Sequence, residues 1–212
     1  MKITKFLHSC VLVETEKRTA LFDPGSFSWQ SGLVKVDGLP AIHDIVITHE
    51  HADHYDENFV TALIEKYPDS QWITNKSIAE KLSGLGAKNI TTSSTKCCEV
   101  RNIPHADVAP FGVPVEHIAV DWNKCVTHPG DTLDFDTTQE ILHLPITAPW
   151  GKTVDAINKF LELKPKYVLP IHDWMLRDEW LQVVYSRLES LCDQNEIVFL
   201  RPINGQAIEV NV

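Results

Sequence analysis

The sequence predicts a single α/β or α+β domain, spanning residues 1–212, in which helices cover β-sheets. Short apolar and β-branched runs alternate with segments of helical periodicity in both halves of the chain. The chain has 212 residues, of which 43% are hydrophobic and 23% are charged, so it is long enough to bury a large core. No repeat, low-complexity tract or flexible linker divides it, which favours one domain.

In the first half, β-branched and aromatic runs bounded by turn residues predict strands at 6–13, 19–22, 45–48 and 71–74. The turn at 23–25 leads into a loop at 26–40 that is rich in Gly, Ser and Asp. Asp56 and Glu57 are expected to begin a helix that Pro68 closes, because acidic residues suit the positive end of the helix dipole. A shorter helix is expected at 76–82.

The second half repeats this alternation of strands and helices. Several strands are expected between residues 90 and 144. Apolar residues at helical spacing predict a helix over 153–163, and an apolar run predicts a strand at 166–171. A longer helix is expected at 174–191, and two strands close the chain.

Charge and cysteine usage narrow the classes of function. Nineteen Lys and Arg against 29 Asp and Glu give a net charge of −10, which argues against a nucleic-acid partner. The chain has no run of apolar residues that could span a bilayer, so no membrane association is expected. Five irregularly spaced cysteines do not form a disulfide framework, and a cytoplasmic location is expected. The oligomeric state and the role of the 26–40 loop, as a cover for a pocket or a contact for self-association, stay open.

The segment Thr-His-Glu-His-Ala-Asp-His at 48–54 carries the clearest chemical signal. In a loop leaving a strand, alternate side chains point to the same side, so His49 and His51 can hold one cation together. Asp53 and His54 lie just beyond, at the turn into a helix, and can face a second cation. Imidazole and carboxylate groups at this density suit zinc, iron or manganese better than calcium.

The spacing His-x-His-x-Asp-His resembles the signature of the metallo-β-lactamase superfamily, and further segments follow in that family's order. They are Ile-Pro-His at 103–105, His-Pro-Gly-Asp-Thr at 128–132 and Val-Leu-Pro-Ile-His at 168–172. The resemblance implies the metallo-β-lactamase fold, a four-layer αββα sandwich with a binuclear metal centre at one edge between the sheets. It is similar to the ascorbate-phosphate lactonase-like and β-lactamase-like branch of the superfamily.

The resemblance also implies a set of metal ligands. They are His49, His51 and His105 for a first metal, Asp53, His54 and His172 for a second, and Asp131 as a bridge between the two. His117 is the rival of His105, although its segment at 115–118 is typical of a strand. The expected cofactors are two divalent ions, with Zn²⁺ favoured and Mn²⁺ or Fe²⁺ as alternatives.

Four further residues have two open interpretations each. His8 either supports the site or contacts substrate, as a histidine near this point does in similar branches of the superfamily, or it packs in the core. Asp23 either forms a turn or supports the metal-binding loops. Trp150 and Trp174 either wall the metal pocket or belong to the core.

The resemblance implies a metal-dependent hydrolase that uses a metal-bridged hydroxide, with Asp53 and Asp131 as its catalytic carboxylates. The bond cleaved would be an ester, lactone or phosphoester of a small metabolite, with phosphorylated or lactone-like compounds as the leading class. A small-molecule substrate is the only partner expected. Two alternatives remain: an iron-dependent oxidoreductase on the same fold, and a metal-binding protein without turnover.

Overall fold

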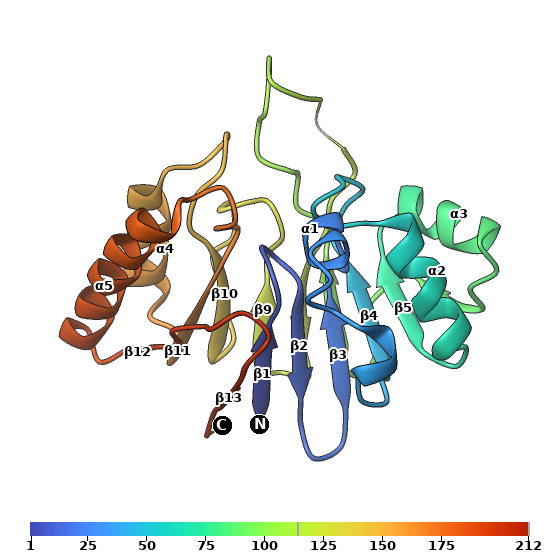
Figure 1. The fold of residues 1–212 in the computed structure, drawn as a ribbon. Helices are drawn as coiled ribbons and strands as arrows, with labels where there is room; N and C mark the ends of the chain where they lie inside the picture. Colours follow the sequence, from blue (N-terminus) through green and yellow to red (C-terminus); the bar gives the residue numbers. More distant parts are fainter. Residues whose placement is uncertain (114, 212) are drawn as a thin grey trace.

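The computed structural model describes residues 1–113 and 115–211 and contains two β-sheets that lie between two layers of helices (Figure 1). The first sheet has the strand order β13 (Ala207–Glu209), β1 (Lys2–Lys5), β2 (Val11–Glu14), β3 (Thr19–Phe22), β4 (Asp44–Ile47), β5 (Gln71–Thr74) and β6 (Asn89–Thr91). The second has the order β12 (Val198–Phe199), β11 (Tyr167–Ile171), β10 (Ile141–Pro145), β9 (Val126–His128), β8 (Ala119–Trp122) and β7 (Cys98–Arg101).

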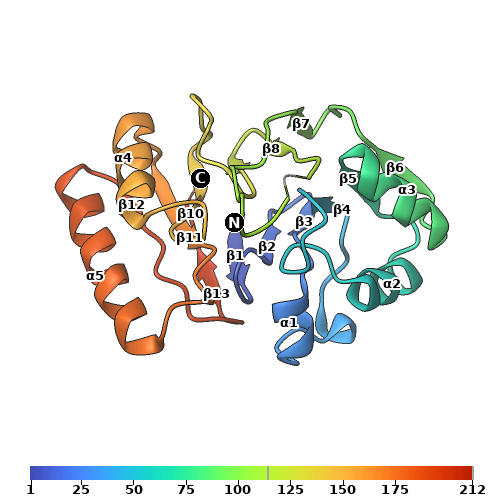
Figure 2. The ribbon, with the colours of Figure 1, turned by 90° about the horizontal axis from the view of Figure 1, so that it is seen from above.

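The helices fall into two groups, one on the outer face of each sheet (Figure 2). Those beside the first sheet are α1 (Ser26–Gln30), the 3₁₀ helix η1 (Val36–Gly38), α2 (Glu57–Lys66) and α3 (Lys76–Gly84). Those beside the second are α4 (Thr153–Leu163) and α5 (Asp178–Gln194). Among the described residues, no helix combines the length and the apolar character that crossing a bilayer requires.

Three apolar clusters fill the three spaces between these four layers. The cluster between the sheets includes Val11, Val120 and Leu169. The other two clusters pack α2 and α3 against the first sheet, and α4 and α5 against the second. This arrangement confirms the predicted four-layer αββα class.

Strand β4 shows why its sequence is a continuous β-branched run. Val46 belongs to the cluster between the sheets, whereas Ile45 and Ile47 face the helices. Both faces of the strand are therefore buried, as is typical of parallel strands covered on each side.

The sheet topology brings the carboxyl ends of several strands of both sheets to one edge of the molecule. In the first sheet, β3 pairs in parallel with β4, and β1 shares their direction because β2 is antiparallel to both β1 and β3. In the second sheet, β9, β10 and β11 are parallel, and β7 shares their direction through the antiparallel β8. Loops that leave the carboxyl ends of parallel strands commonly form binding sites.

Two predicted helices begin where side chains cap them. Asp56 accepts a hydrogen bond from the Phe59 amide and Asn75 accepts one from the Ile78 amide, so both residues satisfy otherwise free N–H groups. The predicted starts of α2 and α3 are confirmed.

Four sequence-based boundaries were wrong. The expected strand 6–13 is interrupted, because the chain turns at His8 with φ 58° and β2 begins only at Val11. The expected loop 26–40 contains α1 and η1. Helix α5 begins at Asp178 rather than at 174, and residues 115–118 precede β8 rather than forming a strand.

Candidate metal centre

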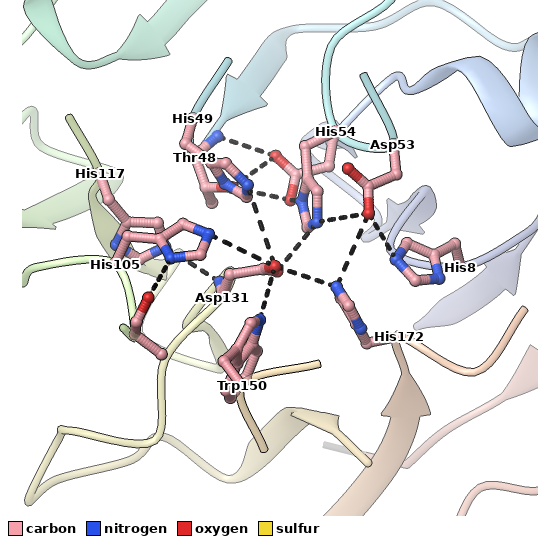
Figure 3. A network of polar contacts seen from close by, with 12 residues as sticks. His8, Thr48, His49, Asp53, His54, His105, His117, Asp131, Trp150 and His172 are labelled. Carbon is pink, nitrogen blue, oxygen red and sulfur yellow. Dashed lines mark hydrogen bonds and ion pairs between the residues drawn. The ribbon is translucent and has the colours of Figure 1, made fainter. Parts of the chain in front are cut away.

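The strand ends described above carry two groups of His and Asp side chains that meet at Asp131 (Figure 3). The first cluster is His49, His51, His105 and Asp131, and the second cluster is His8, Asp53, His54 and His172. Within each cluster one candidate ligand atom per residue can be chosen so that all lie within 4.8 Å of one another. The structure therefore brings together all seven ligands that the sequence suggested, and it adds His8.

Each of these residues follows the carboxyl end of a strand at the common edge. His8 follows β1 and the 49–54 segment follows β4, while His105 follows β7 and His172 follows β11. Asp131 follows β9 after a sharp turn at Gly130, where φ is 61° and a Cβ would lie 2.5 Å from His117 Nε2. Only glycine fits at this position.

Asp131 lies between the two clusters. Its Oδ1 is 2.9 Å from His54 Nε2, and its Oδ2 is 3.0 Å from His172 Nε2. Oδ2 also lies 3.6 Å from His105 Nε2, in the first cluster. The two oxygens of this carboxylate can therefore serve two cations at once.

Hydrogen bonds at the outer ring nitrogens fix the tautomers of four histidines. His105 Nδ1 donates to the Ala106 carbonyl and His172 Nδ1 donates to the Thr147 carbonyl, both at 2.6 Å. His54 Nδ1 donates to Asp23 at 2.7 Å. The Thr48 hydroxyl donates to Asp23 and so accepts from His49 Nδ1 at 3.0 Å. The Nε2 of each of these four rings is therefore the atom that faces the site, where it would present a lone pair to a bound metal.

Asp23 holds several of these residues on the side away from the cavity. It is fully buried and accepts hydrogen bonds from the Thr48 amide and hydroxyl and from His54 Nδ1 and His128 Nε2. His128 in turn accepts a hydrogen bond from His143 through the paired Nδ1 atoms, 2.9 Å apart. Of the two interpretations of Asp23, the geometry favours support of the metal-binding loops.

The electrostatics of the site favour a bound positive charge. Burial lowers the pKa of His54, but Asp131, Asp23 and Asp53 outweigh it and raise this pKa well above its ordinary value. For Asp131, burial raises the pKa, but His172 and His54 outweigh it and hold the pKa well below its ordinary value. The carboxylates therefore stay ionised and attract a cation.

The ring of His117 lies behind the first cluster and has both nitrogens occupied. Its Nδ1 donates to the Ile103 carbonyl at 2.8 Å, and its Nε2 accepts from the Asp131 amide at 3.0 Å. No lone pair is left for a metal, and His117 holds the Asp131 backbone instead. The structure thus places His105, and not its rival, in the first cluster.

His8 is buried beside the second cluster. Its Nε2 donates to Asp53 Oδ2 at 3.0 Å, and its ring lies 3.9 Å from that of His172 between centroids. Burial and the neighbouring His172 lower the pKa of His8 to about 4, so the ring is neutral at physiological pH. This geometry favours support of Asp53 over core packing alone.

A cavity of about 240 Å³ opens onto both clusters. It is lined by Phe27, His51, Asp53, His105, Val108, Phe111, Gly112, Asp131, Pro149, Trp150, His172 and Met175. Trp150 lines it and donates from Nε1 to Asp131 Oδ2 at 3.0 Å. Trp174 lies beside the cavity, outside its lining, and stacks on Phe27 with ring centroids 4.0 Å apart.

Sequence reasoning missed Thr48 and the aromatic lining of this cavity. Phe27 reaches the cavity from α1, so the 26–40 segment contributes directly to the site. Gly25 allows this approach, because a Cβ there would lie 1.8 Å from the Asp53 carbonyl oxygen. Neither Phe27 nor Phe111 belongs to a periodic pattern that could have marked it, whereas Thr48 directly precedes the histidine motif.

The donor set fits two divalent metal ions. Buried Nε2 atoms of His49, His54 and His105 and the buried Oδ1 of Asp131 have no hydrogen-bond partner. Buried polar atoms are rarely left without partners, and these four of the nine such side-chain atoms among the described residues lie together around Asp131. The atoms are those by which imidazole and carboxylate groups bind zinc, iron or manganese.

Comparison with known proteins agrees with this geometry. The sequence model of the β-lactamase superfamily domain matches residues 2–172, which include every residue of both clusters. The chain belongs to the β-lactamase superfamily. The resemblance found in the sequence is thereby confirmed, and so is the fold that it implied.

Relatives within the superfamily match over most of their length. Protein Rv0786c of Mycobacterium tuberculosis is 29% identical over 207 residues, covering 90% of this chain and 92% of its own. A UPF0173 metal-dependent hydrolase of Carboxydothermus hydrogenoformans is 26% identical and covers 81% of this chain and 84% of its own.

Solved structures of this superfamily fold carry different activities. The metallo hydrolase Igni18 of Ignicoccus hospitalis has a TM-score of 0.67 at 19% identity, covering 99% of both chains. CmlA of Streptomyces venezuelae, a diiron β-hydroxylase, also has a TM-score of 0.67, at 14% identity over 99% of this chain and 54% of its own. At these identities the likeness concerns the fold alone.

Proposed function

We propose that this chain is a metal-dependent hydrolase with two divalent ions, most simply Zn²⁺, that cleaves an ester, lactone or phosphoester bond of a small molecule. The observation that carries the proposal is the pair of clusters that meet at Asp131, with the Nε2 atoms of His49, His54, His105 and His172 directed inward and their Nδ1 atoms held by hydrogen bonds. The hydrolase names of the Carboxydothermus relative and of Igni18 agree with it.

In this proposal His49, His51 and His105 would hold one ion, Asp53, His54 and His172 would hold the other, and Asp131, which lies between the two clusters, would help to hold both. When bound, such ions polarise the bond to be cleaved and lower the pKa of water enough for hydrolysis at neutral pH.

The chain's own residues then position the reactants. Asp53 lines the cavity with one carboxylate oxygen held by His8, so its other oxygen can accept a hydrogen bond from water and orient it. Trp150 steadies Asp131 through its indole N–H, and Phe27 and Pro149 present apolar surface to the cavity.

A cavity of about 240 Å³ suits a small molecule, which is the partner we propose. The net charge of −10 supports a function without nucleic acid, and the unpaired cysteines support a cytoplasmic location.

The test combines elemental analysis with turnover. We expect purified protein to hold two metal equivalents, to lose turnover of a phosphodiester, ester and lactone panel on chelation, and to regain it when metal is added back. His51→Ala should lose one equivalent and turnover together, because His51 has a role only in the first cluster.

The matched control is Glu50→Ala. Glu50 lies in the same loop but pairs with Lys81 and Ser77, so this variant should keep both metals and turnover. A His51→Ala protein that binds two equivalents as tightly as the wild type would contradict the ligand assignment. Iron in the purified protein, with oxygen consumption and no hydrolysis, would replace the hydrolase by an oxidoreductase.

A further inference from the structure

The cavity above the metal centre has two chemically different sides. Its floor consists of the cluster residues His51, Asp53, His105, Asp131 and His172. Its walls consist of Phe27, Val108, Phe111, Gly112, Pro149, Trp150 and Met175. All polar side chains that face the cavity therefore belong to the floor, apart from the indole N–H of Trp150, which Asp131 already occupies.

The walls offer nothing that would bind an anion away from the floor. Among the described residues that line the cavity, none is Lys or Arg. Lys5, at the end of β1 toward the same edge, is buried and held by Asp173 at 2.8 Å and by Asn204 at 3.3 Å. A phosphate or carboxylate placed against these walls would lose its water without gaining a partner.

The aromatic walls are held in place by their neighbours. Phe27 stacks on Trp174 with an interplanar angle of 17° and contacts the ring of His8 edge-on at 5.2 Å. Trp150 is fixed by its hydrogen bond to Asp131. Aromatic surfaces that are held in place around a small cavity favour an apolar occupant, whose burial removes apolar area from water on both sides.

We propose that the substrate is an uncharged ester or lactone whose non-reacting part is small and apolar, instead of a phosphorylated metabolite. This inference rests on the proposed hydrolase function and narrows its substrate class. In the reaction the oxygen of water bonds to the carbonyl carbon and the ester C–O bond breaks. One proton of the water passes to the leaving alcohol, and the acid releases the other.

The volume of the cavity limits the size of that apolar part. Pockets for drug-sized ligands measure about 300–1,000 Å³. The cavity here, at about 240 Å³, lies below that range and must also hold the reacting carbonyl. A short acyl chain or a single ring is therefore the expected occupant.

A matched pair of substrates tests the charge preference directly. p-Nitrophenyl butyrate and p-nitrophenyl hemisuccinate have the same leaving group and the same number of acyl carbons, and they differ in a methyl group against a carboxylate. We expect the metal-loaded protein to prefer the butyrate in kcat/KM by at least about tenfold, because the walls leave a carboxylate unpaired.

Two lysine variants then test whether these walls set the preference. Phe111 lines the cavity, whereas Val113 lies two residues away outside the lining, and both are exposed, at 83% and 76%. Phe111→Lys should lower the butyrate-to-hemisuccinate ratio about fivefold, the size of one exposed ion pair. Val113→Lys adds the same charge and should leave the ratio unchanged, as should the apolar Phe111→Leu.

The outcomes separate this inference from the function on which it rests. If the hemisuccinate or p-nitrophenyl phosphate is the better substrate, or if both lysine variants shift the ratio equally, the apolar-substrate inference is overturned and the hydrolase stands. If protein with two bound metals turns over no ester, lactone or phosphoester, the proposed function itself is overturned.

Discussion

The first and second clusters each take two residues from the 49–54 loop and two from distant segments, but they differ in the member that is partly exposed. The first cluster takes two of its histidines from one loop, and His51 at the cavity is only partly buried. In the second cluster the partly buried member is Asp53, a carboxylate that belongs to this cluster alone.

Each candidate metal ligand of the second cluster is held by a hydrogen bond with a neighbour, whereas among the described residues none holds His51 of the first cluster. His54 is held by Asp23, Asp53 by His8, and His172 by the Thr147 carbonyl. His8 and His172 have φ angles of 58° and 61°, a conformation that costs energy for residues other than glycine. We therefore expect the second cluster to bind its metal more tightly, and the first to exchange its metal more readily and to contact substrate.

Substitution of Asp131 should lower the metal affinity of both clusters, because its carboxylate lies within reach of both. Asp131→Ala leaves buried imidazoles without their shared partner, a loss of about 4 kcal/mol or on the order of a thousandfold in kcat/KM. Elemental analysis should show that the purified variant holds less metal in both clusters, with fewer than two equivalents per chain. Asp134→Ala, an exposed position in the same loop, is the control and should retain both.

A reciprocal pair of variants should weaken one cluster at a time. In Asp23→Asn, an amide N–H₂ opposes the N–H of His54 or His128, so metal affinity of the second cluster should fall about 10- to 100-fold. In Thr48→Val, His49 loses its acceptor and the first cluster should weaken by a similar factor. Competition with a chromophoric chelator measures the two affinities separately.

One result with Asp23→Asn and Thr48→Val would contradict the proposed independence of the two clusters. In the Asp23→Asn variant, the Thr48 hydroxyl can still donate to the amide carbonyl oxygen of the new side chain and accept from His49, so the first cluster should survive. If each variant lowers both affinities to the same extent, the clusters act as one unit and the comparison fails.

Substitution of His8 should lower the metal affinity of the second cluster alone, and by a smaller factor than Asp23→Asn does. His8→Asn keeps a residue that tolerates positive φ but is too short to reach Asp53, and the lost hydrogen bond should cost about tenfold in second-cluster affinity. His8→Gln, with a longer amide, should restore part of it. The neighbouring Ser9→Ala is the control, since its buried hydroxyl has no partner. If His8→Asn lowers the metal affinity of the first cluster by the same factor, His8 has a general role in folding.

The sequence could predict the local parts of this centre because they lie close together along the chain. The 48–54 motif and the start of α2 depend on neighbouring residues. Asp23 could not be distinguished from an ordinary turn residue, because its partners lie 25 to 105 positions away. The turn at His8 escaped detection because residues 6–13 show strand-like composition while the backbone reverses between them. Likewise, apolar residues at 174 and 175 suggested an earlier start for α5 although both side chains are exposed.

Substitution of Trp150 should lower kcat/KM least, since its one hydrogen bond at the centre goes to Asp131 Oδ2. Trp150→Phe keeps an aromatic wall but removes one hydrogen bond to Asp131 Oδ2, worth about 0.5–1.5 kcal/mol. We expect kcat/KM to fall roughly two- to tenfold with both metal equivalents retained, because the remaining contacts of Asp131 still hold its carboxylate. Trp174→Phe, which changes a tryptophan outside the cavity lining, should have a smaller effect on kcat/KM. If Trp150→Phe instead releases a metal, the indole must fix the position of Asp131, and the two clusters would then depend on a residue that belongs to neither.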